Sequence, residues 1–522
     1  MGKLLNPGSM GFEISRNTRP YVDKSMIIEL LNSKVNTENR FVCVSRPRRF
    51  GKTMTINMLS AYYDRQSDAD ALFQGMKITE SKSFTRCSNS FNVIKINMQE
   101  FVSHAKNAVE LIHTLSDYLL KEVLRSYPSL DYIDKGNLSY VLETVSEYTG
   151  IQFIIIIDEW DSLFREYKDD RESQRLYLDF LRDFLKDKAY IALCYMTGIL
   201  PIKKYGTHSA LNMFAEFSME NPGEMAEFTG FTEEETEELC REYDIDLTEL
   251  REWYDGYSFP DCQHIYNPKS IVMAVTTGIL DDYWNRTETY EALRAYINLN
   301  FDGLRDNILK LIAGDRQMIN TRSFQNDMTD FSSCDDVLTL LIHLGYLGYD
   351  FNSKEVFIPN KEIMEEFVTA TTAREPWEEV VNSIRNSRAL LRDTWNGNEN
   401  AVAQQIESAH LETSHLQYND ENALSYTISL AYYAARDYYT VIRELPAGKG
   451  FADLVFVPRK NHMNCPAMII ELKWNSSAET ALSQITDRKY PEALGEYTGS
   501  ILLVGINYDR KTKKHNCKIK KI

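Results

Sequence analysis

Gly51, Lys52 and Thr53 have the residue types and the order that bind phosphate groups. A lysine in this place reaches the β- and γ-phosphates of a nucleotide, and the adjacent hydroxyl ligates Mg²⁺. An apolar run precedes the three residues and a helical pattern follows, so N–H groups at the helix start would cradle phosphate oxygens. Arg46 stands where such loops usually carry their first glycine. The residues expected to contact the nucleotide are Arg49, Phe50, Gly51, Lys52, Thr53 and Met54.

A second motif ends an apolar run, 153–157, with two carboxylates, Asp158 and Glu159. Five consecutive bulky apolar residues are typical of a central parallel strand covered on both faces. We expect Asp158 to hold Mg²⁺ and Glu159 to orient or deprotonate the attacking water. The alternative is a buried strand followed by an acidic helix start. Thr197 ends another predicted strand and is the candidate sensor of the γ-phosphate, the alternative being an ordinary turn.

Near the C-terminus, Asp453 lies on one predicted strand and Glu471 and Lys473 lie on the next. Glu471 and Lys473 are two residues apart, so they face the same side of their strand. Two carboxylates bind Mg²⁺, which polarises a scissile phosphate, and a lysine positions water or offsets negative charge. This pattern predicts phosphodiester hydrolysis; the alternative is a surface Glu–Lys pair beside an unrelated Asp. The flanking helices would add further side chains to the pocket: Glu421 as a metal ligand, Gln484 and Tyr490.

The chain has 522 residues, 43% hydrophobic and 12% aromatic, which is typical of a globular protein of two to four domains. It has no run near the roughly 18 apolar residues of a membrane span and no apolar signal region at its N-terminus. Eight scattered cysteines indicate neither a disulfide framework nor a zinc ribbon, so we expect a cytoplasmic protein.

The net charge of −18 repels nucleic acid, so any DNA contact must use local basic patches. One patch surrounds the phosphate-binding loop, 46–52, and the other is the tail, 510–522. The tail is equally well explained as a solvated edge strand, because lysines on an edge discourage aggregation.

Residues 1–230 alternate strand and helix patterns. Strands are predicted at 40–45, 91–97, 152–158 and 190–196, and helices at 52–64, 105–126, 138–148 and 172–187. This alternation predicts an α/β fold in which helices cover both faces of a parallel sheet.

The pattern changes after residue 230. Residues 231–395 are mostly helical; they begin with a capped acidic helix at Thr232 and include a helix at 336–347 followed by a two-stranded wing at 348–358. A winged helix binds DNA or protein. After the polar stretch 396–400, strands are predicted at 439–444, 451–457, 467–473 and 500–506, with helices at 421–438 and 478–490. The predicted domains are therefore 1–230, 231–395 and 396–522.

The chain resembles the bacterial AAA-ATPase-like proteins in the segments Tyr21–Lys24, Arg46–Thr53, Asp158-Glu159, Phe231–Glu235, Trp253–Tyr257 and Tyr266–Pro268. Their phosphate-binding loop reads R-P-R-R-F-G-K-[ST], which accommodates Arg46. The C-terminal part is similar to the PD-(D/E)XK nuclease superfamily, whose motif would be Asp453, Glu471 and Lys473, with Glu421 as the upstream acid. The proline that names the motif is absent, because Ala452 precedes Asp453. The resemblance covers nearly the whole chain and implies a P-loop NTPase fold followed by a restriction-endonuclease-like domain.

These patterns predict an ATP- and Mg²⁺-binding ATPase coupled to a nuclease-like domain that acts on DNA, with ATP gating access to the DNA. The alternative is a nucleotide-switched scaffold or sensor whose nuclease-like fold only binds DNA or protein. ATP hydrolysis usually needs an arginine that neutralises the transition state, and Arg165, Arg171 and Arg182 are available. If a neighbouring subunit supplies this arginine instead, the active form is an oligomer.

Overall fold

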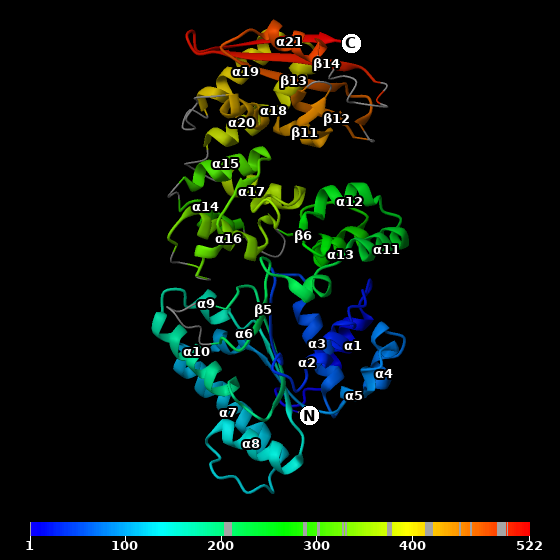
Figure 1. Ribbon diagram of the computed structural model, residues 1–522, viewed down its shortest axis with the longest axis vertical. Coiled ribbons are helices and arrows are strands. Elements are labelled where there is room, and N and C mark those ends of the chain that lie inside the picture. The colour runs from blue at the N-terminus through cyan, green and yellow to red at the C-terminus, as the bar shows by residue number, and fades with distance from the viewer. Residues whose placement is uncertain are drawn as a thin grey trace. The chain divides into compact units, whose positions relative to one another are not determined.

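The computed structural model, shown in Figure 1, describes residues 2–202, 211–284, 290–299, 303–325, 328, 331–372, 378–412, 421–447, 450–459, 462–487, 497 and 499–522. The chain divides into two compact parts. Unit 1 is Met1–Glu288 with Met318–Ile363, and unit 2 is Thr289–Gln317 with Met364–Ile522. The chain therefore passes between the units three times. Across these described ranges, every helix is too short or too polar to cross a bilayer.

The centre of unit 1 is a five-stranded sheet in the order β2-β3-β4-β1-β5. Its strands are β1 (Phe41–Ser45), β2 (Asn92–Asn97), β3 (Phe153–Asp158), β4 (Ile191–Gly198) and β5 (Ala215–Phe217). Each strand runs parallel to its neighbours, so all the carboxyl ends meet at one edge of the sheet. The four predicted strands are confirmed. The short β5 was not predicted.

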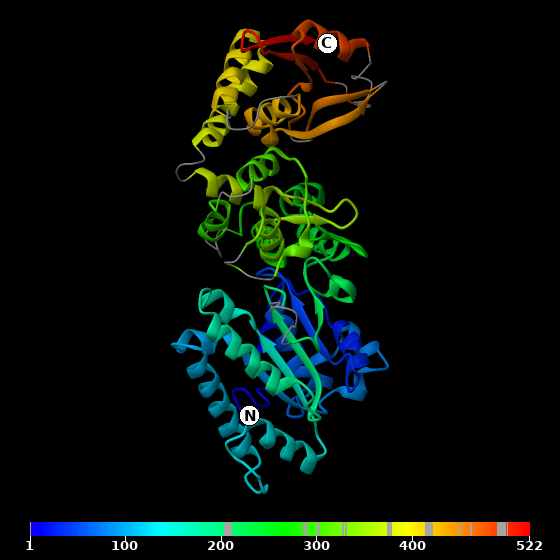
Figure 2. The ribbon, with the colours of Figure 1, turned by 60° about the vertical axis from the view of Figure 1, so that its left-hand side comes forward.

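Helices cover both faces of this sheet, as Figures 1 and 2 show. One core packs α7, α8 and α10 against Cys43, Ile155 and Ile157, and the other packs α2 and α3 against Val44 and Ile156. Side chains alternate across a strand, so successive residues enter different cores. The predicted α/β architecture is confirmed. The helices are α1 (Met10–Asn17), α2 (Ile27–Lys34), α3 (Lys52–Tyr63), α4 (Ala69–Phe73), η1 (Lys77–Glu80), α5 (Phe84–Cys87), α6 (Met98–His104), α7 (Ala108–Ser126), α8 (Leu138–Thr149), α9 (Ser162–Glu166) and α10 (Arg171–Leu185).

A mostly helical region completes unit 1. Its elements are η2 (Gly223–Phe228), α11 (Glu233–Tyr243), α12 (Leu247–Tyr254), β6 (Tyr257–Phe259), β7 (Cys262–Ile265), α13 (Pro268–Thr277), η3 (Thr321–Ser323), α16 (Cys334–Leu344), β9 (Gly348–Asp350) and β10 (Glu355–Phe357). The predicted capping box starts α11: Thr232 and Glu235 each accept the other's backbone N–H. The predicted helix and wing are also found, because α16 leads into the antiparallel pair β9–β10, which β8 (Gln317–Met318) extends.

Unit 2 contains a five-stranded sheet in the order β11-β12-β13-β14-β15. Only β13 and β14 run parallel. One face packs against α18, α19 and α20 and the other against α21. Its elements are α14 (Tyr290–Ile297), α15 (Leu304–Ala313), α17 (Lys361–Thr372, which starts in unit 1), α18 (Glu378–Trp395), α19 (Glu399–Glu412), α20 (Glu421–Ala431), η4 (Tyr433–Asp437), β11 (Tyr439–Ala447), β12 (Gly450–Pro458), β13 (Ala467–Trp474), α21 (Ala478–Asp487), β14 (Ile501–Asp509) and β15 (Lys514–Lys521).

The limits of the two units differ from the predicted domain boundaries at 230 and 395. The polar stretch 396–400 lies at the turn between α18 and α19, inside unit 2. The division into three domains stays a prediction. The basic tail forms β15 at the edge of the sheet, as one of its two interpretations expected.

Candidate functional site

The phosphate-binding loop joins the carboxyl end of β1 to α3, whose first residue is Lys52. Gly51 has φ +85°, a left-handed conformation that strains residues with a side chain. A Cβ added there would meet nothing within 4 Å, so the backbone angle, not crowding, requires glycine. Arg49 has φ +70° without being glycine. Such strained residues cluster at ligand-binding loops, where the surrounding structure holds them in place.

Arg46 replaces the usual first glycine of the loop, and its side chain turns into the protein interior. The side chain is fully buried, and Nη1 donates to the carbonyl oxygens of Ser45 (2.9 Å) and Phe217 (3.1 Å). The guanidinium lies 5.2 Å from the centre of the Phe259 ring, a cation–π distance. Burial lowers the pKa of Arg46 to about 10, so it stays charged at neutral pH. Arg46 therefore anchors the loop to β5 and β6.

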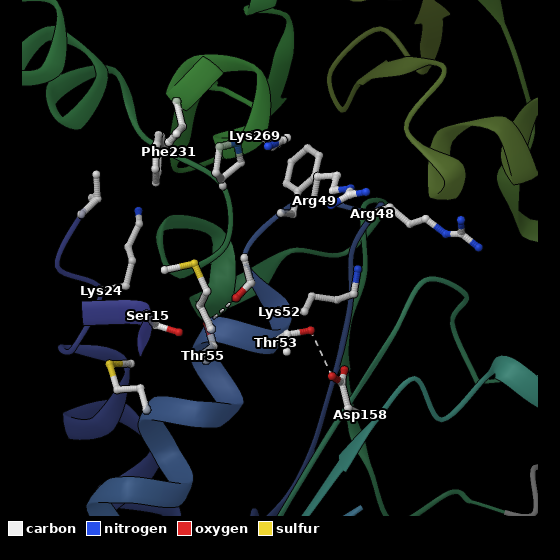
Figure 3. A pocket seen from close by; sticks show the side chains of 18 of the residues that line it. Ser15, Lys24, Arg48, Arg49, Lys52, Thr53, Thr55, Asp158, Phe231 and Lys269 are labelled. Atoms are coloured by element: carbon white, nitrogen blue, oxygen red, sulfur yellow. Dashed lines mark hydrogen bonds between the residues drawn. The ribbon is translucent and has the colours of Figure 1, made fainter. Parts of the chain in front are cut away.

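The predicted phosphate and metal groups lie together above the sheet edge (Figure 3). Lys52 Nζ donates to the carbonyl oxygens of Arg46 (2.9 Å) and Pro47 (2.7 Å). Thr53 Oγ1 donates to Asp158 Oδ2 at 3.1 Å. Asp158 is 2% exposed, and burial, followed by the charge of Glu159, raises its pKa to about 6. A hydroxyl beside a buried carboxylate fits Mg²⁺, which prefers oxygen ligands and would offset the cost of the buried charge.

These groups line a cavity of about 710 Å³ in unit 1, a usual size for a ligand pocket. The predicted nucleotide contacts, residues 49–54 with Asp158, all contribute to its wall. An excess of positive charge in a chain of net charge −18 indicates an anionic ligand. Two lining residues are acidic, Asp158 and Glu159, and six are basic: Lys24, Arg48, Arg49, Lys52, Arg165 and Lys269.

Much of the cavity wall was not predicted. Figure 3 shows four such residues, Ser15, Lys24, Phe231 and Lys269, which come from α1, the segment after it, the segment before α11, and α13. Phe231 and Lys24 belong to motifs of the family resemblance, but nothing in their spacing assigned them a role. Asn97 and Gln99 also line the cavity. Their signal was available, because Asn97 ends and Gln99 follows a strand whose carboxyl end meets the same sheet edge.

Thr197 lies at the carboxyl end of β4, between the ends of β3 and β1. It is fully buried, its carbonyl oxygen accepts the N–H of Trp160 at 3.1 Å, and it is not among the described residues that line the cavity. Its role as a γ-phosphate sensor stays a prediction.

Glu159 lies next to Asp158 with φ +53°, so it too is strained. Its carboxylate forms an ion pair with Arg165, and Arg165 Nε lies 3.4 Å from Asp161 Oδ2. Asp161 is fully buried and accepts the backbone N–H groups of Ile199 (3.0 Å) and Leu200 (2.9 Å). Glu159, the predicted catalytic base, is therefore held by Arg165, which also contacts the fixed carboxylate of Asp161.

The four C-terminal candidates with described side chains come together on the α21 side of the sheet of unit 2. Asp453 precedes Leu454, which pairs with Ile470 across β12 and β13, and Asp453 Oδ2 accepts the backbone N–H of Leu472 at 2.6 Å. Glu471 is 1% exposed; its Oε1 lies 2.9 Å from Lys473 Nζ and also accepts from Gln484. The same-side placement of Glu471 and Lys473 is thus found, and Gln484 joins them.

Two other candidates cannot be placed at this site. Glu421 is the first residue of α20, but its side chain lies outside the described part of the structure, and Tyr490 lies outside the described residues altogether. Within the described residues, no cluster of three or more His, Cys, Asp or Glu could hold a metal. Asp453 and Glu471 supply two carboxylates, the kind of oxygen ligand that Mg²⁺ prefers.

Comparisons with known proteins find one family model that matches within unit 1 and another that matches within unit 2. The family model described as "Predicted AAA-ATPase" matches residues 9–207, and that of the PD-(D/E)XK nuclease superfamily matches residues 421–518. An uncharacterized protein from the vnfD 5' region of Azotobacter chroococcum is 22% identical over 277 residues, 52% of this chain and 51% of that protein. The chain thus spans about half the length of this curated relative.

Solved structures overlap the chain only loosely. The Walker-type ATPase PABY2304 of Pyrococcus abyssi gives a TM-score of 0.35 at 15% identity and covers 66% of this chain and 94% of its own. The ORC2 protein of Aeropyrum pernix gives 0.26 at 10% identity, with coverages of 68% and 96%. The family matches carry the comparison: residues 9–207 match the predicted AAA-ATPase family, and residues 421–518 match the PD-(D/E)XK nuclease superfamily.

Proposed function

We propose that this protein binds and hydrolyses ATP with Mg²⁺ in the cavity of unit 1, and that this reaction gates cleavage of DNA at Asp453 and Glu471 in unit 2. The observation that carries the proposal is the charge of the cavity, which six basic side chains line together with the Thr53–Asp158 pair. A nucleoside triphosphate with its metal is the ligand of matching charge.

Each residue has a role that follows from its chemistry. Lys52 exchanges its two carbonyl partners for phosphate oxygens, which offer stronger charge-assisted hydrogen bonds. Thr53 and Asp158 hold the metal, and Glu159 accepts the proton of the attacking water. When bound, Mg²⁺ neutralises the charge that develops on the phosphates.

In unit 2, Asp453 and Glu471 would hold Mg²⁺ against a scissile phosphodiester. Lys473 lies 2.9 Å from Glu471 and would orient the attacking water beside it or stabilise the developing negative charge. Gln484 fixes the Glu471 carboxylate in its orientation.

Purified full-length protein should release phosphate from ATP and cleave plasmid DNA in the presence of Mg²⁺. We expect Lys52→Ala to abolish ATP turnover and Glu471→Ala to abolish cleavage. Each substitution should leave unchanged the thermal unfolding midpoint of the unit that does not carry it. ATP turnover that survives Lys52→Ala would mean that the nucleotide binds elsewhere. Cleavage that is equal with and without ATP would refute the gating.

A second function keeps the nucleotide chemistry and drops the cleavage: a nucleotide-switched scaffold whose nuclease-like unit only binds DNA or protein. The engagement of Glu471 by both Lys473 and Gln484 favours it, because those contacts compete with a metal. Asp453→Ala separates the two functions. Absence of cleavage by both the wild type and this variant, with ATP binding retained, would support the scaffold.

A further inference from the structure

Arg165 is the one among the three arginines considered from the sequence that lines the described cavity. Arg171 is the exposed first residue of α10, and Arg182 forms exposed ion pairs with Asp179 (3.0 Å) and Asp183 (3.7 Å) on the same helix. Arg165, in contrast, lies in the short helix α9 beside Glu159, with its side chain 9% exposed.

The two carboxylates that hold Arg165 differ in burial and in how the backbone holds them. Asp161 is buried and fixed by the backbone N–H groups of Ile199 and Leu200. Glu159 is 24% exposed at its side chain, lines the cavity and has a strained backbone. Arg165 therefore has one fixed partner, Asp161, and one partner that can leave, Glu159.

We propose that Arg165 is a switch that reads the terminal phosphate of the nucleotide within the same chain. This inference rests on the proposed ATP hydrolysis. Without a triphosphate, Arg165 holds Glu159 in an ion pair and keeps it from acting as a base. A terminal phosphate in the cavity competes for the guanidinium, which keeps its contact with Asp161, transfers to the phosphate and leaves Glu159 free.

The released carboxylate of Glu159 then acts as the base in hydrolysis of the terminal phosphate. The water oxygen bonds to the terminal phosphorus, the bond from that phosphorus to the oxygen bridging to the β-phosphate breaks, and Glu159 takes the water proton. Arg165 stabilises the charge on the terminal phosphate oxygens. ADP lacks the terminal phosphate, so it leaves the Arg165–Glu159 pair in place.

Binding affinities test this switch without relying on turnover. The experiment titrates full-length protein by calorimetry with ADP and with a non-hydrolysable ATP analogue, both with Mg²⁺. The proteins compared are the wild type, Arg165→Ala, Arg165→Lys, Glu159→Gln and the double variant of Arg165→Ala with Glu159→Gln. Arg182→Ala is the matched control, because it removes a surface arginine of the neighbouring helix.

Arg165→Ala should weaken binding of the ATP analogue about tenfold or more, the loss of one charge-assisted contact, and change ADP binding less than about twofold. Glu159→Gln should tighten analogue binding because Arg165 no longer has a charged competitor. That gain should disappear in the double variant. Arg165→Lys should fall between wild type and Arg165→Ala, and Arg182→Ala should match wild type.

Two results would overturn the switch while leaving the proposed function intact: equal effects of Arg165→Ala on both nucleotides, or a gain from Glu159→Gln that persists without Arg165. A wild type that binds neither nucleotide would overturn the proposed function and the switch together. Glu159→Gln and Arg165→Lys keep the test decisive if Arg165→Ala does not fold.

Discussion

Asp158 is a carboxylate that the fold keeps in an unfavourable environment. It ends a strand buried on both faces, and burial raises its pKa to about 6. Lys52 and the Thr53 hydroxyl oppose this shift only in part. A carboxylate held at such a cost in a cavity wall is typical of a ligand site, where the ligand supplies the missing charge.

Asp158→Asn should separate stability from function at this position. The amide keeps an acceptor for Thr53 and removes the buried charge. We expect the free energy of unfolding at pH 7 to rise by up to about 3 kcal/mol, since a pKa raised by about two units corresponds to that difference. ATP turnover should fall at least tenfold. Thermal unfolding without nucleotide and a phosphate-release assay measure the two effects; a less stable variant that still hydrolyses ATP would contradict this account.

Arg46→Gly would give the loop its usual first glycine, and we expect it to harm the protein. The substitution removes two hydrogen bonds and the contact with Phe259, and leaves a space in the interior. The free energy of unfolding should fall by about 2–4 kcal/mol, and ATP affinity should not improve. Denaturant unfolding and nucleotide titration test this. Arg48→Gly, at an exposed place in the same loop, is the control for added backbone freedom in the unfolding measurement only, because Arg48 lines the cavity.

Among the elements, α19 closes the edge of the sheet in unit 2. Its Glu399 accepts the backbone N–H of Ile519 at 3.0 Å, and its Glu407 accepts that of His515 at 3.4 Å. An edge strand otherwise offers such groups to other chains. The same contact buries a cluster in which the rings of His410, His515 and Tyr508 lie 4.7–4.9 Å apart.

The histidine cluster makes the packing of α19 on β15 sensitive to acid. Burial lowers the pKa of His410 to about 4 and that of His515 to about 3, so the folded state holds both rings neutral. The unfolded state binds more protons below about pH 6.5, so this stability is present above that pH and is lost as the pH falls toward 4. Hydrogen exchange of β14 and β15 at pH 7, 5.5 and 4.5 should show the loss. His515→Phe should reduce it; an unchanged pH dependence would contradict the role of the cluster.

The regular elements were predictable, because buried parallel strands such as β3 are continuous apolar runs and their carboxyl ends share an edge. That placed Lys52, Thr53, Asp158 and Glu159 in one site. The far wall of the cavity was not predictable, because Ser15 and Lys269 reach it only through the packing of distant segments. Nor does spacing indicate that Arg165 pairs with Glu159, since Glu159 lies outside helix α9 and has a left-handed backbone conformation.

At the scale of the whole molecule, Glu362 connects segments that lie near two of the points where the chain passes from one unit to the other. It is 1% exposed, and its carboxylate accepts the hydroxyl of Ser270 (2.9 Å) and the backbone N–H groups of Tyr283 (2.9 Å) and Trp284 (3.0 Å). Ser270 belongs to α13, which also lines the cavity of unit 1. Burial raises the pKa of Glu362 to about 8.

Glu362→Gln should remove a pH dependence. The folded state retains a proton that the unfolded state loses above about pH 4.5, so this contribution to the free energy of unfolding is full below that pH and is lost as the pH rises through about 8. The glutamine variant should lack this decline. Glu362→Ala should cost about 3 kcal/mol or more at every pH, because buried donors lose their acceptor. Denaturant unfolding from pH 5 to 9 tests both; parallel curves for wild type and Glu362→Gln would contradict the assignment.

The chain passes between the two units three times, and this has a consequence for recombination within the gene. Residues 289–317 precede the last part of unit 1 in the chain, yet they supply Asp315 and Ile312, which pair with Arg443 and Arg436 in unit 2. A gene fragment that starts after codon 317 would encode the C-terminal sheet without these partners. Recombination at that point would therefore separate the sheet of unit 2 from part of its own unit.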